Sequence, residues 1–329
     1  MKLTATLAAM ATTLTMGAAY ADGIEDPSRD GYFEQFKGKT IAFVPASMGI
    51  DLTEAWAKMM QREADKLGMT FTIRDAAWSS DVGAQAITSL ISEKPDVMVI
   101  HNPDVQSYAR LLQKAEKAGI KVLQINMKSA YGTDAYIGAD WVGIGEQQAE
   151  AAVALCGEGT SRKVQIVQGM LTAAASAYTM KGVENVLSQH PEIEVVSNQP
   201  AEWDATKARN LTATVLQQHP DLCASIGFWD VMDTGTAAAL KEADRADVHV
   251  ITSGGGAQMA CDHVESGLFD TVISYDAPNQ GNELNAMIRT LIQQETPAGE
   301  TKVTLYSPTK VITKDTLSGG SCWTIDQIQ

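Results

Sequence analysis

Two stretches of the chain, AAWSSDVGAQAITSLISEKPDVMVI (76–100) and AEWDATKARNLTATVLQQHPDLCASI (201–226), share one pattern. Each has Ala-x-Trp, then a segment of helical period, then Pro-Asp before an apolar run of strand length. The separation between Trp78 and Trp203 equals the separation between Pro95 and Pro220. This agreement predicts two copies of one βα domain rather than a single large sheet.

Apolar runs of strand length alternate with helical segments on both sides of these stretches. Helices are expected at 52–67, 82–92, 105–118 and 280–294. Buried strands that lack polar alternation and are separated by helices predict parallel sheets covered on both faces, so the expected fold class is α/β and doubly wound. The expected strands are 40–44, 71–74, 97–100, 121–125, 164–167, 194–196, 224–227, 248–251, 271–274 and 303–306.

The N-terminus has the parts of a secretory signal peptide. Met1-Lys2 is a short basic start, an apolar run follows over 3–17, and Ala19-Tyr20-Ala21 supplies the small residues of a cleavage site. A membrane anchor is the alternative, but the apolar run is too short to span a bilayer. We therefore expect residues 1–21 to be a signal peptide that is cleaved before Asp22, and the protein to be exported.

The acidic composition limits the partners. The formal net charge is −15, and no cluster of Lys and Arg offsets it. Such a surface repels nucleic acid and anionic membranes. We expect neither as a partner.

The four cysteines are Cys156, Cys223, Cys261 and Cys322. An oxidising compartment would permit disulfides between them. Among the three connectivities that four cysteines allow, we favour Cys156–Cys223 and Cys261–Cys322, because each would join neighbouring elements. Free thiols are the alternative. A metal site is disfavoured, since no CxxC or Cys/His spacing supports it.

Motifs of catalysis and cofactor binding are absent from the sequence: it has no P-loop, GxSxG, HExxH, GxGxxG after a strand, or EF-hand loop. Of the five histidines, only His101 follows a strand at a place suited to a cleft, and a lone His there is more often structural. SGGGAQ (253–258) runs from a strand into a helix, where backbone amides can hold an anion. With no Lys or Arg nearby we expect tight packing there instead. We expect no enzyme, no catalytic residue, no metal and no cofactor.

The carboxyl ends of the expected strands carry aromatic, amide and acidic side chains, and ligands of open α/β sheets bind outside these ends. Aromatic faces combined with Asp and Asn suit a molecule with an apolar C–H face and a rim of hydroxyls, which is a sugar or polyol. We expect ligand contact for Trp203 and Trp229, which are each followed by Asp. For Trp56, Trp78 and Trp323 we expect a place in the core or at a domain interface.

Seven segments, in order and spacing, resemble those of the periplasmic ribose/galactose-type sugar-binding proteins that serve ABC importers. The resemblance runs over nearly the whole chain after the signal peptide. It implies two Rossmann-like domains joined by a three-segment hinge, with an N-terminal lobe of 22–139 plus 276–307 and a C-terminal lobe of 140–275 plus 308–329. The segments are KTIAFVP (39–45), EADKLG (63–68), AGIKVLQIN (118–126), IGAD (137–140), VQG (167–169), QPAEWD (199–204) and GFWD (227–230).

The resemblance also assigns site residues by position. Trp203 matches the family's sugar-stacking aromatic, and Asp230 matches the acid of an Asn-Asp pair in which Trp229 replaces the Asn. Asn126-Met127 replaces an Asp-Arg pair that grips hydroxyls. Fewer charges and more indole surface favour a deoxysugar, polyol, cyclitol or furanoside over ribose or over an acid, which would require Arg. The expected ligand contacts are Asp51, Asn102 and Asn126 from the first lobe and Trp141, Trp203, Trp229, Asp230 and Tyr275 from the second.

The function that this resemblance implies is that of a periplasmic solute-binding protein, monomeric, which delivers a sugar, polyol or cyclitol to an ABC permease in the inner membrane. The ligand would touch both lobes only after hinge closure, and so would shift the population toward the closed form. Two alternatives remain open: a sensor subunit that serves a chemoreceptor or kinase, and a secreted enzyme. A sugar-responsive transcription regulator would need an N-terminal helix-turn-helix, where this chain has the signal peptide.

Overall fold

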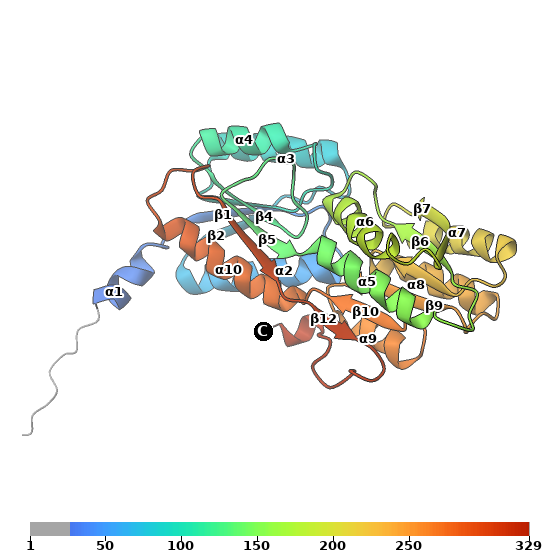
Figure 1. Ribbon diagram of the computed structural model, residues 1–329. Coiled ribbons are helices and arrows are strands. Elements are labelled where there is room, and N and C mark those ends of the chain that lie inside the picture. The colour runs from blue at the N-terminus through green and yellow to red at the C-terminus, as the bar shows by residue number, and fades with distance from the viewer. Residues whose placement is uncertain (1–26, 329) are drawn as a thin grey trace, which may run out of the picture.

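Two six-stranded sheets form the framework of the protein (Figure 1). The computed structural model describes residues 27–328, so the expected signal peptide lies outside the described residues. All neighbours in the first sheet pair in parallel, in the order β11-β5-β4-β3-β1-β2. Its strands are β1 (Thr40–Val44), β2 (Thr70–Ile73), β3 (Val97–Ile100), β4 (Lys121–Ile125), β5 (Ala135–Ala139) and β11 (Val303–Ser307).

The second sheet repeats the topology of the first. Its order is β12-β10-β9-β8-β6-β7, and every pair is parallel except the edge pair β10–β12. In the first sheet β1 lies between β2 and β3, and in the second sheet β6 lies between β7 and β8. The predicted pair of doubly wound α/β domains is confirmed. The strands are β6 (Lys163–Gln168), β7 (Glu194–Pro200), β8 (Ala224–Gly227), β9 (His249–Gly254), β10 (Thr271–Ser274) and β12 (Lys310–Ile312).

Helices cover both faces of each sheet. In the first sheet, α2 and α10 pack together on one face and α3 and α4 on the other. In the second sheet, α5 and α6 lie on one face, and α7, α8 and α9 lie on the other. The described helices are α1 (Pro27–Glu34), α2 (Asp51–Leu67), α3 (Ser80–Glu93), α4 (Ala109–Lys117), α5 (Trp141–Leu155), α6 (Ala174–Leu187), α7 (Ala205–Gln218), α8 (Asp230–Glu242), α9 (Gln258–Glu265), α10 (Ala277–Gln293) and the short 3₁₀ helix η1 (Ile325–Gln327).

The duplicated sequence has a duplicated backbone. In the first copy Ala77 and Trp78 have φ of 49° and 60°, and in the second copy Glu202 and Trp203 have φ of 55° and 66°. Residues other than glycine rarely adopt this left-handed region. The two Ala-x-Trp units therefore fold into the same unusual turn after β2 and after β7.

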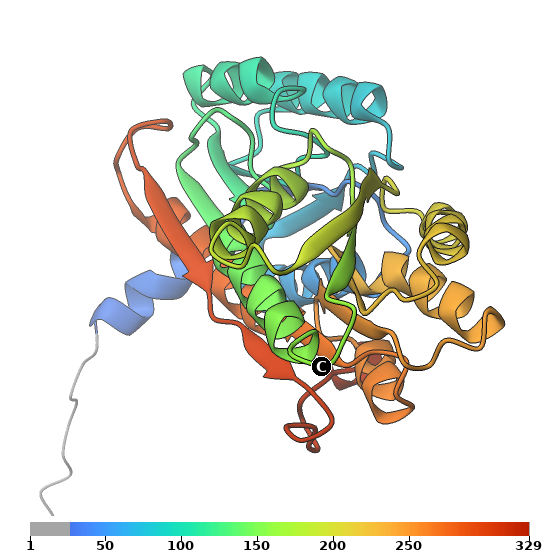
Figure 2. The ribbon, with the colours of Figure 1, turned by 45° about the vertical axis from the view of Figure 1, so that its right-hand side comes forward.

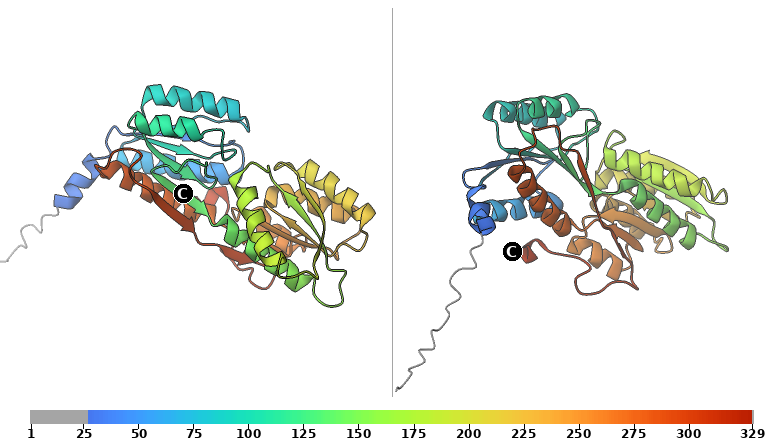
Figure 3. Two further views of the ribbon diagram at one scale, coloured as in Figure 1. Left: turned by 45° about the horizontal axis from the view of Figure 1, so that its top comes forward. Right: turned by 60° about the vertical axis from the view of Figure 1, so that its left-hand side comes forward.

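The chain passes between the two sheets at three places. It leaves the first sheet after β5 and enters the second through α5, returns after β10 into α10, and crosses again between β11 and β12. Figure 2 shows β11 at the edge of the first sheet, and Figure 3 shows α5 and the β11–β12 segment at the junction of the two halves. The residue limits that we expect for the two lobes remain a prediction.

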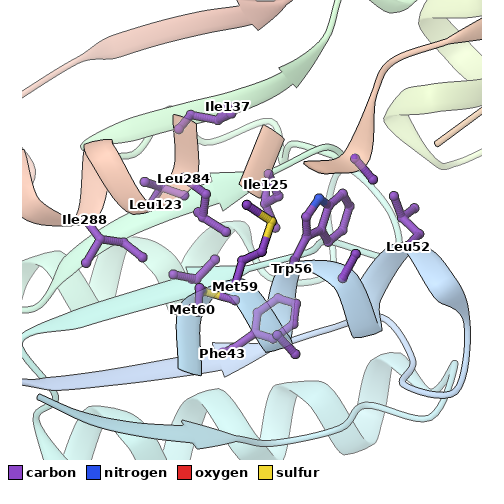
Figure 4. Packing of buried hydrophobic residues seen from close by; sticks show 14 of the residues in the cluster. Phe43, Leu52, Trp56, Met59, Met60, Leu123, Ile125, Ile137, Leu284 and Ile288 are labelled. Carbon is purple, nitrogen blue, oxygen red and sulfur yellow. The ribbon is translucent and has the colours of Figure 1, made fainter. Parts of the chain in front are cut away.

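A buried apolar cluster fixes α2 and α10 on the first sheet (Figure 4). Phe43 from β1 and Trp56 and Met60 from α2 are fully buried, and Leu284 and Ile288 from α10 complete the layer. Each such side chain contributes about 1.5–3 kcal/mol by leaving water. The expected core place of Trp56 is confirmed, and Trp323, at 8% exposed, is also buried.

Two disulfides lie in the second half, in the predicted pairing. Cys156 follows α5 and is joined to Cys223, which precedes β8. Cys261 of α9 is joined to Cys322 in the C-terminal tail. This second bond holds the tail near the first half, where the Lys58 ammonium of α2 donates to the Ile325 carbonyl at 2.9 Å.

Candidate ligand-binding site

A small pocket, with a cavity volume of about 30 Å³, lies where strand ends of the two sheets face each other. Residues that follow β1, β2, β3 and β4 form one side, and residues that follow β7, β8 and β10, with the starts of α5 and α6, form the other. No Asp, Glu, Lys or Arg lines it. The lining residues are Ile50, Leu52, Trp78, His101, Asn126, Met127, Trp141, Ala175, Trp203, Phe228, Trp229 and Tyr275.

Three tryptophans form an aromatic wall across the pocket. The ring of Trp229, just before α8, lies between those of Trp203 and Trp78, with centroids 6.2 and 6.3 Å away. The Trp203–Trp229 pair is edge-to-face at 84°, one of the geometries that aromatic pairs prefer. The expected positions of Trp203 and Trp229 at the pocket follow directly from the strand ends that precede them.

The position of Trp203 is set by the turn after β7, by the start of α7 and by Gly169 on the neighbouring strand end. β7 ends at Pro200, and the left-handed turn at Glu202 and Trp203 sends the indole toward the pocket. Asp204 then begins α7, with its carboxylate accepting from the Lys207 amide at 2.8 Å. The ring lies against Gly169 at the end of β6, where a Cβ would be only 2.1 Å from an indole carbon.

Trp78 lines the pocket from the first half, although we expected no ligand role for it. We expected it in the core or at a domain interface. It lies at the interface between the two halves rather than in the core, and its side chain is 45% exposed and also lines the pocket. It contacts Trp229 of the opposite half. The two halves face each other through their strand ends, so equivalent turns of both copies reach the same pocket.

Trp141 and Tyr275 form the floor of the pocket together with Asn126. Their rings are edge-to-face at 5.3 Å, and the Trp141 Nε1–H donates to the Asn126 carbonyl at 2.9 Å. Asn126 itself has φ of 60°, and its carbonyl also accepts from the Tyr136 hydroxyl at 2.7 Å. Burial, with a smaller contribution from Asp230, raises the pKa of the Tyr275 hydroxyl, which therefore stays protonated.

Of the adjacent residues His101 and Asn102, we expected Asn102 to contact the ligand, but His101 is the one that lines the pocket. Asn102 is fully buried, does not line the pocket, and donates to the Gln124 side chain and the Met127 carbonyl, each at 2.9 Å. It ties the ends of β3 and β4 together. His101, which the sequence favoured as structural, lines the pocket instead, and burial lowers its pKa to about 3.

The two expected acids lie beside the pocket, in a neighbouring hollow that Trp229 and Trp323 also line. Asp230 is 2% exposed and accepts from the Val231 amide at 2.8 Å. Burial raises its pKa to about 7, and Asp51 of the opposite half adds repulsion. A Cβ at residue 254 would lie 1.9 Å from the Asp230 carboxylate, so Gly254 makes room for it.

Several lining residues were not among our expected contacts: Ile50, Leu52, Met127, Ala175 and Phe228, besides Trp78 and His101. His101 and Phe228 directly follow the end of an expected strand and Met127 lies close to one, whereas the others come from longer loops or the first turn of a helix. Listing every residue at such an end, apolar ones included, would have found His101 and Phe228. Ala175 belongs to the segment after the expected strand 164–167 and lies in the first turn of α6.

Within residues 27–328, no group of three or more His, Cys, Asp or Glu is placed to hold a metal ion. In that same part of the chain, no helix is both long and apolar enough to cross a membrane. The Gly-rich turn expected to pack tightly does so: a Cβ at Gly256 would lie 2.3 Å from the Ser274 hydroxyl.

Two α/β domains of one topology with an uncharged pocket between their strand ends define a two-lobed receptor for a small solute. The chain belongs to the family described as periplasmic binding protein domain, which it matches over residues 41–296. This is a family of solute-binding proteins that catalyse no reaction.

Curated relatives and solved structures agree with this assignment. The chain is 27% identical over 226 residues to the ribose import binding protein RbsB of Bacillus subtilis (68% of this chain, 72% of the relative), and 26% identical over 216 residues to a D-apiose import binding protein of Actinobacillus succinogenes (64% and 68%). An ABC transporter solute-binding protein from Mycobacterium smegmatis with bound glycerol superposes with a TM-score of 0.77 at 23% identity, covering 87% of this chain and 99% of that one. At that identity the likeness shows a shared fold.

Proposed function

We propose that this protein is the substrate receptor of an ABC importer for a neutral sugar, polyol or cyclitol, bound between the two lobes. The observation that carries the proposal is a pocket lined by four tryptophans and no Asp, Glu, Lys or Arg.

The indoles favour ligands with an apolar face. Aromatic side chains offer large apolar surfaces, and a sugar or polyol can lay its C–H groups on them while its hydroxyls reach polar groups at the edge. A carboxylate or phosphate ligand would lose its hydration without gaining an Arg or Lys. We propose Asn126, Trp141, Trp203, Trp229 and Tyr275 as contacts, with Asp51 and Asp230 next to them and Asn102 as support for the ends of β3 and β4.

The names of relatives support this class of ligand. Besides ribose and D-apiose import binding proteins, they include a D-allose-binding protein of Escherichia coli and a xylitol-binding protein of Mycolicibacterium smegmatis. Structures of similar fold contain D-fucose or glycerol. These ligands are all uncharged, in keeping with the uncharged pocket.

Closure follows from the position of the site. Trp78 comes from the first half and Trp203 and Trp229 from the second, so a molecule held among them touches both lobes. A ligand with contacts on both sides stabilises the closed arrangement over an open one. We propose that the closed form is what the inner-membrane permease recognises, that residues 1–21 direct export to the periplasm, and that the protein acts as a monomer.

A thermal-shift panel tests the proposal. The panel contains D-ribose, D-apiose, D-allose, D-fucose, xylitol, glycerol and myo-inositol, with D-glucuronate as the charged control. Ligands that bind the folded state raise its melting temperature according to concentration over Kd. We expect at least one neutral member to stabilise the protein and D-glucuronate to have no effect. Stabilisation by D-glucuronate alone, or by no member at all, would contradict the proposal.

A further inference from the structure

His101 is a buried polar side chain with nothing in the protein to bind. It directly follows β3, is 2% exposed, and lines the pocket. Neither ring nitrogen has a hydrogen-bond partner. Its only close ring contact in the described structure is with Trp56, edge-to-face at 5.3 Å, which holds the imidazole plane without using either nitrogen.

The other polar groups of the pocket floor already bind one another. The Asn126 carbonyl accepts from Trp141, and its side-chain oxygen accepts from the Gln280 amide at 3.5 Å. His101 differs from them, because its nitrogens lack partners although buried polar groups in folded proteins nearly always have one.

The chemistry of a neutral imidazole fits a hydroxyl group. It offers one N–H donor and one nitrogen acceptor, and a hydroxyl can accept the first or donate to the second. No charge is available for attracting an anion, since burial holds the pKa of His101 at about 3. The imidazole therefore offers hydrogen bonds without charge, which suits a neutral hydroxyl.

We propose that His101 is the polar anchor of the binding site, and that its imidazole hydrogen-bonds a hydroxyl of the sugar or polyol whose apolar face lies on the tryptophans. This inference rests on the proposed function and adds to it the residue that orients the ligand. Contact with the indoles leaves the ligand free to rotate in the plane of its apolar face. A hydrogen bond to His101 fixes the position of one ligand hydroxyl and so sets the orientation of the ligand. It is thus a residue that determines specificity.

Two substitutions separate binding from folding. His101→Phe keeps an aromatic ring against Trp56 and removes both nitrogens, and His101→Gln keeps a donor and an acceptor. His190→Phe, which changes a histidine near the protein surface that pairs with Glu192, is the matched control. The affinity of each variant is measured by calorimetric titration at neutral pH. The ligand is the neutral panel member that stabilises the wild type most. Melting temperatures without sugar are measured in parallel.

We expect His101→Phe to weaken binding by about 10- to 100-fold, the effect of losing a buried hydrogen bond, with an unliganded melting temperature no lower than that of the wild type. His101→Gln should restore most of the affinity, and His190→Phe should bind as the wild type does. Unchanged binding by His101→Phe, or a loss that accompanies a lower melting temperature and is not restored by Gln, would overturn the inference alone. If no panel member binds the wild type, the proposed function fails and the inference falls with it.

Discussion

Asp233, in the first turn of α8, is a carboxyl group that the fold buries completely. The Thr252 hydroxyl donates to it at 2.5 Å, and Gly227 leaves it room, because a Cβ there would lie 2.0 Å from its oxygens. Burial raises the pKa of Asp233 to about 8, and repulsion from Asp230 acts in the same direction. The folded protein therefore keeps this carboxyl protonated at neutral pH.

The stability of the protein should depend on pH through this group. The unfolded chain releases the proton near 3.8 and the folded protein only near 8, so folding takes up a proton between these values and stability falls as the pH rises. Asp233→Asn does not titrate. We predict that the melting temperature of Asp233→Asn relative to the wild type rises from about pH 5 to about pH 8. The exposed Asp315→Asn should show no such trend, and a constant difference for Asp233→Asn would contradict the assignment.

At the scale of single residues, the sequence predicted which kinds of side chain gather at the strand ends better than it predicted which individual residue lines the pocket. Trp203, Trp229, Trp141, Asn126 and Tyr275 line the pocket as expected, because each lies at or next to a strand end. The roles of His101 and Asn102 depend on which of two adjacent side chains points into the pocket. Residues that alternate along an extended backbone point to opposite sides, and one position of register decides the outcome.

At the scale of elements, β6 and β7 act together to place the indole of Trp203. The turn after β7 directs the ring, and the end of the neighbouring β6 provides the surface on which it lies, because Gly169 has no side chain. The position of the ring thus depends on a contact between residues from two strands. A single methyl group on the neighbouring strand should move it.

We predict that Gly169→Ala weakens binding of the strongest panel sugar by about tenfold or more, since a Cβ 2.1 Å from the ring forces the indole to shift. Gly132→Ala is the control, because no atom lies within 4 Å of its Cβ position. Calorimetric titration measures both variants, and near-ultraviolet circular dichroism reports whether the indole has moved. Wild-type affinity in Gly169→Ala would contradict this account of how the ring is supported.

Elements with a strong pattern were predicted well, and those without one were not. The strands 40–44, 97–100, 121–125, 224–227 and 271–274 have the expected bounds, since each is a short apolar run that the sheet buries on both faces. The expected helix at 105–118 begins later, at Ala109, because the Asp104 carboxylate accepts from the amides of Gln106 and Ser107, each at 2.8 Å, and forms a turn. The strands β5 and β12 were not assigned from the sequence, since AYIGA contains a glycine and KVI is very short.

At the scale of the whole molecule, duplication explains both the pocket and the position of Trp78 in it. Two copies of one α/β unit face each other through their strand ends, so corresponding turns meet across the space between them. The sequence repeat predicted two domains, whereas their facing arrangement came from the family resemblance. A repeat gives no relative orientation of its two copies, so the sequence did not predict that Trp78 of the first copy lines the same pocket as Trp203.

The measurement that tests the central claim most directly is calorimetric titration of the strongest panel sugar or polyol into the wild type and into Trp203→Ala. Phe33→Ala, which removes an exposed ring from α1, is the matched control. We predict one site per chain in the wild type and in the control, and binding at least about tenfold weaker in Trp203→Ala, which corresponds to about 1.4 kcal/mol or more. Equal affinity in Trp203→Ala and the wild type would contradict a ligand held between the lobes on this indole.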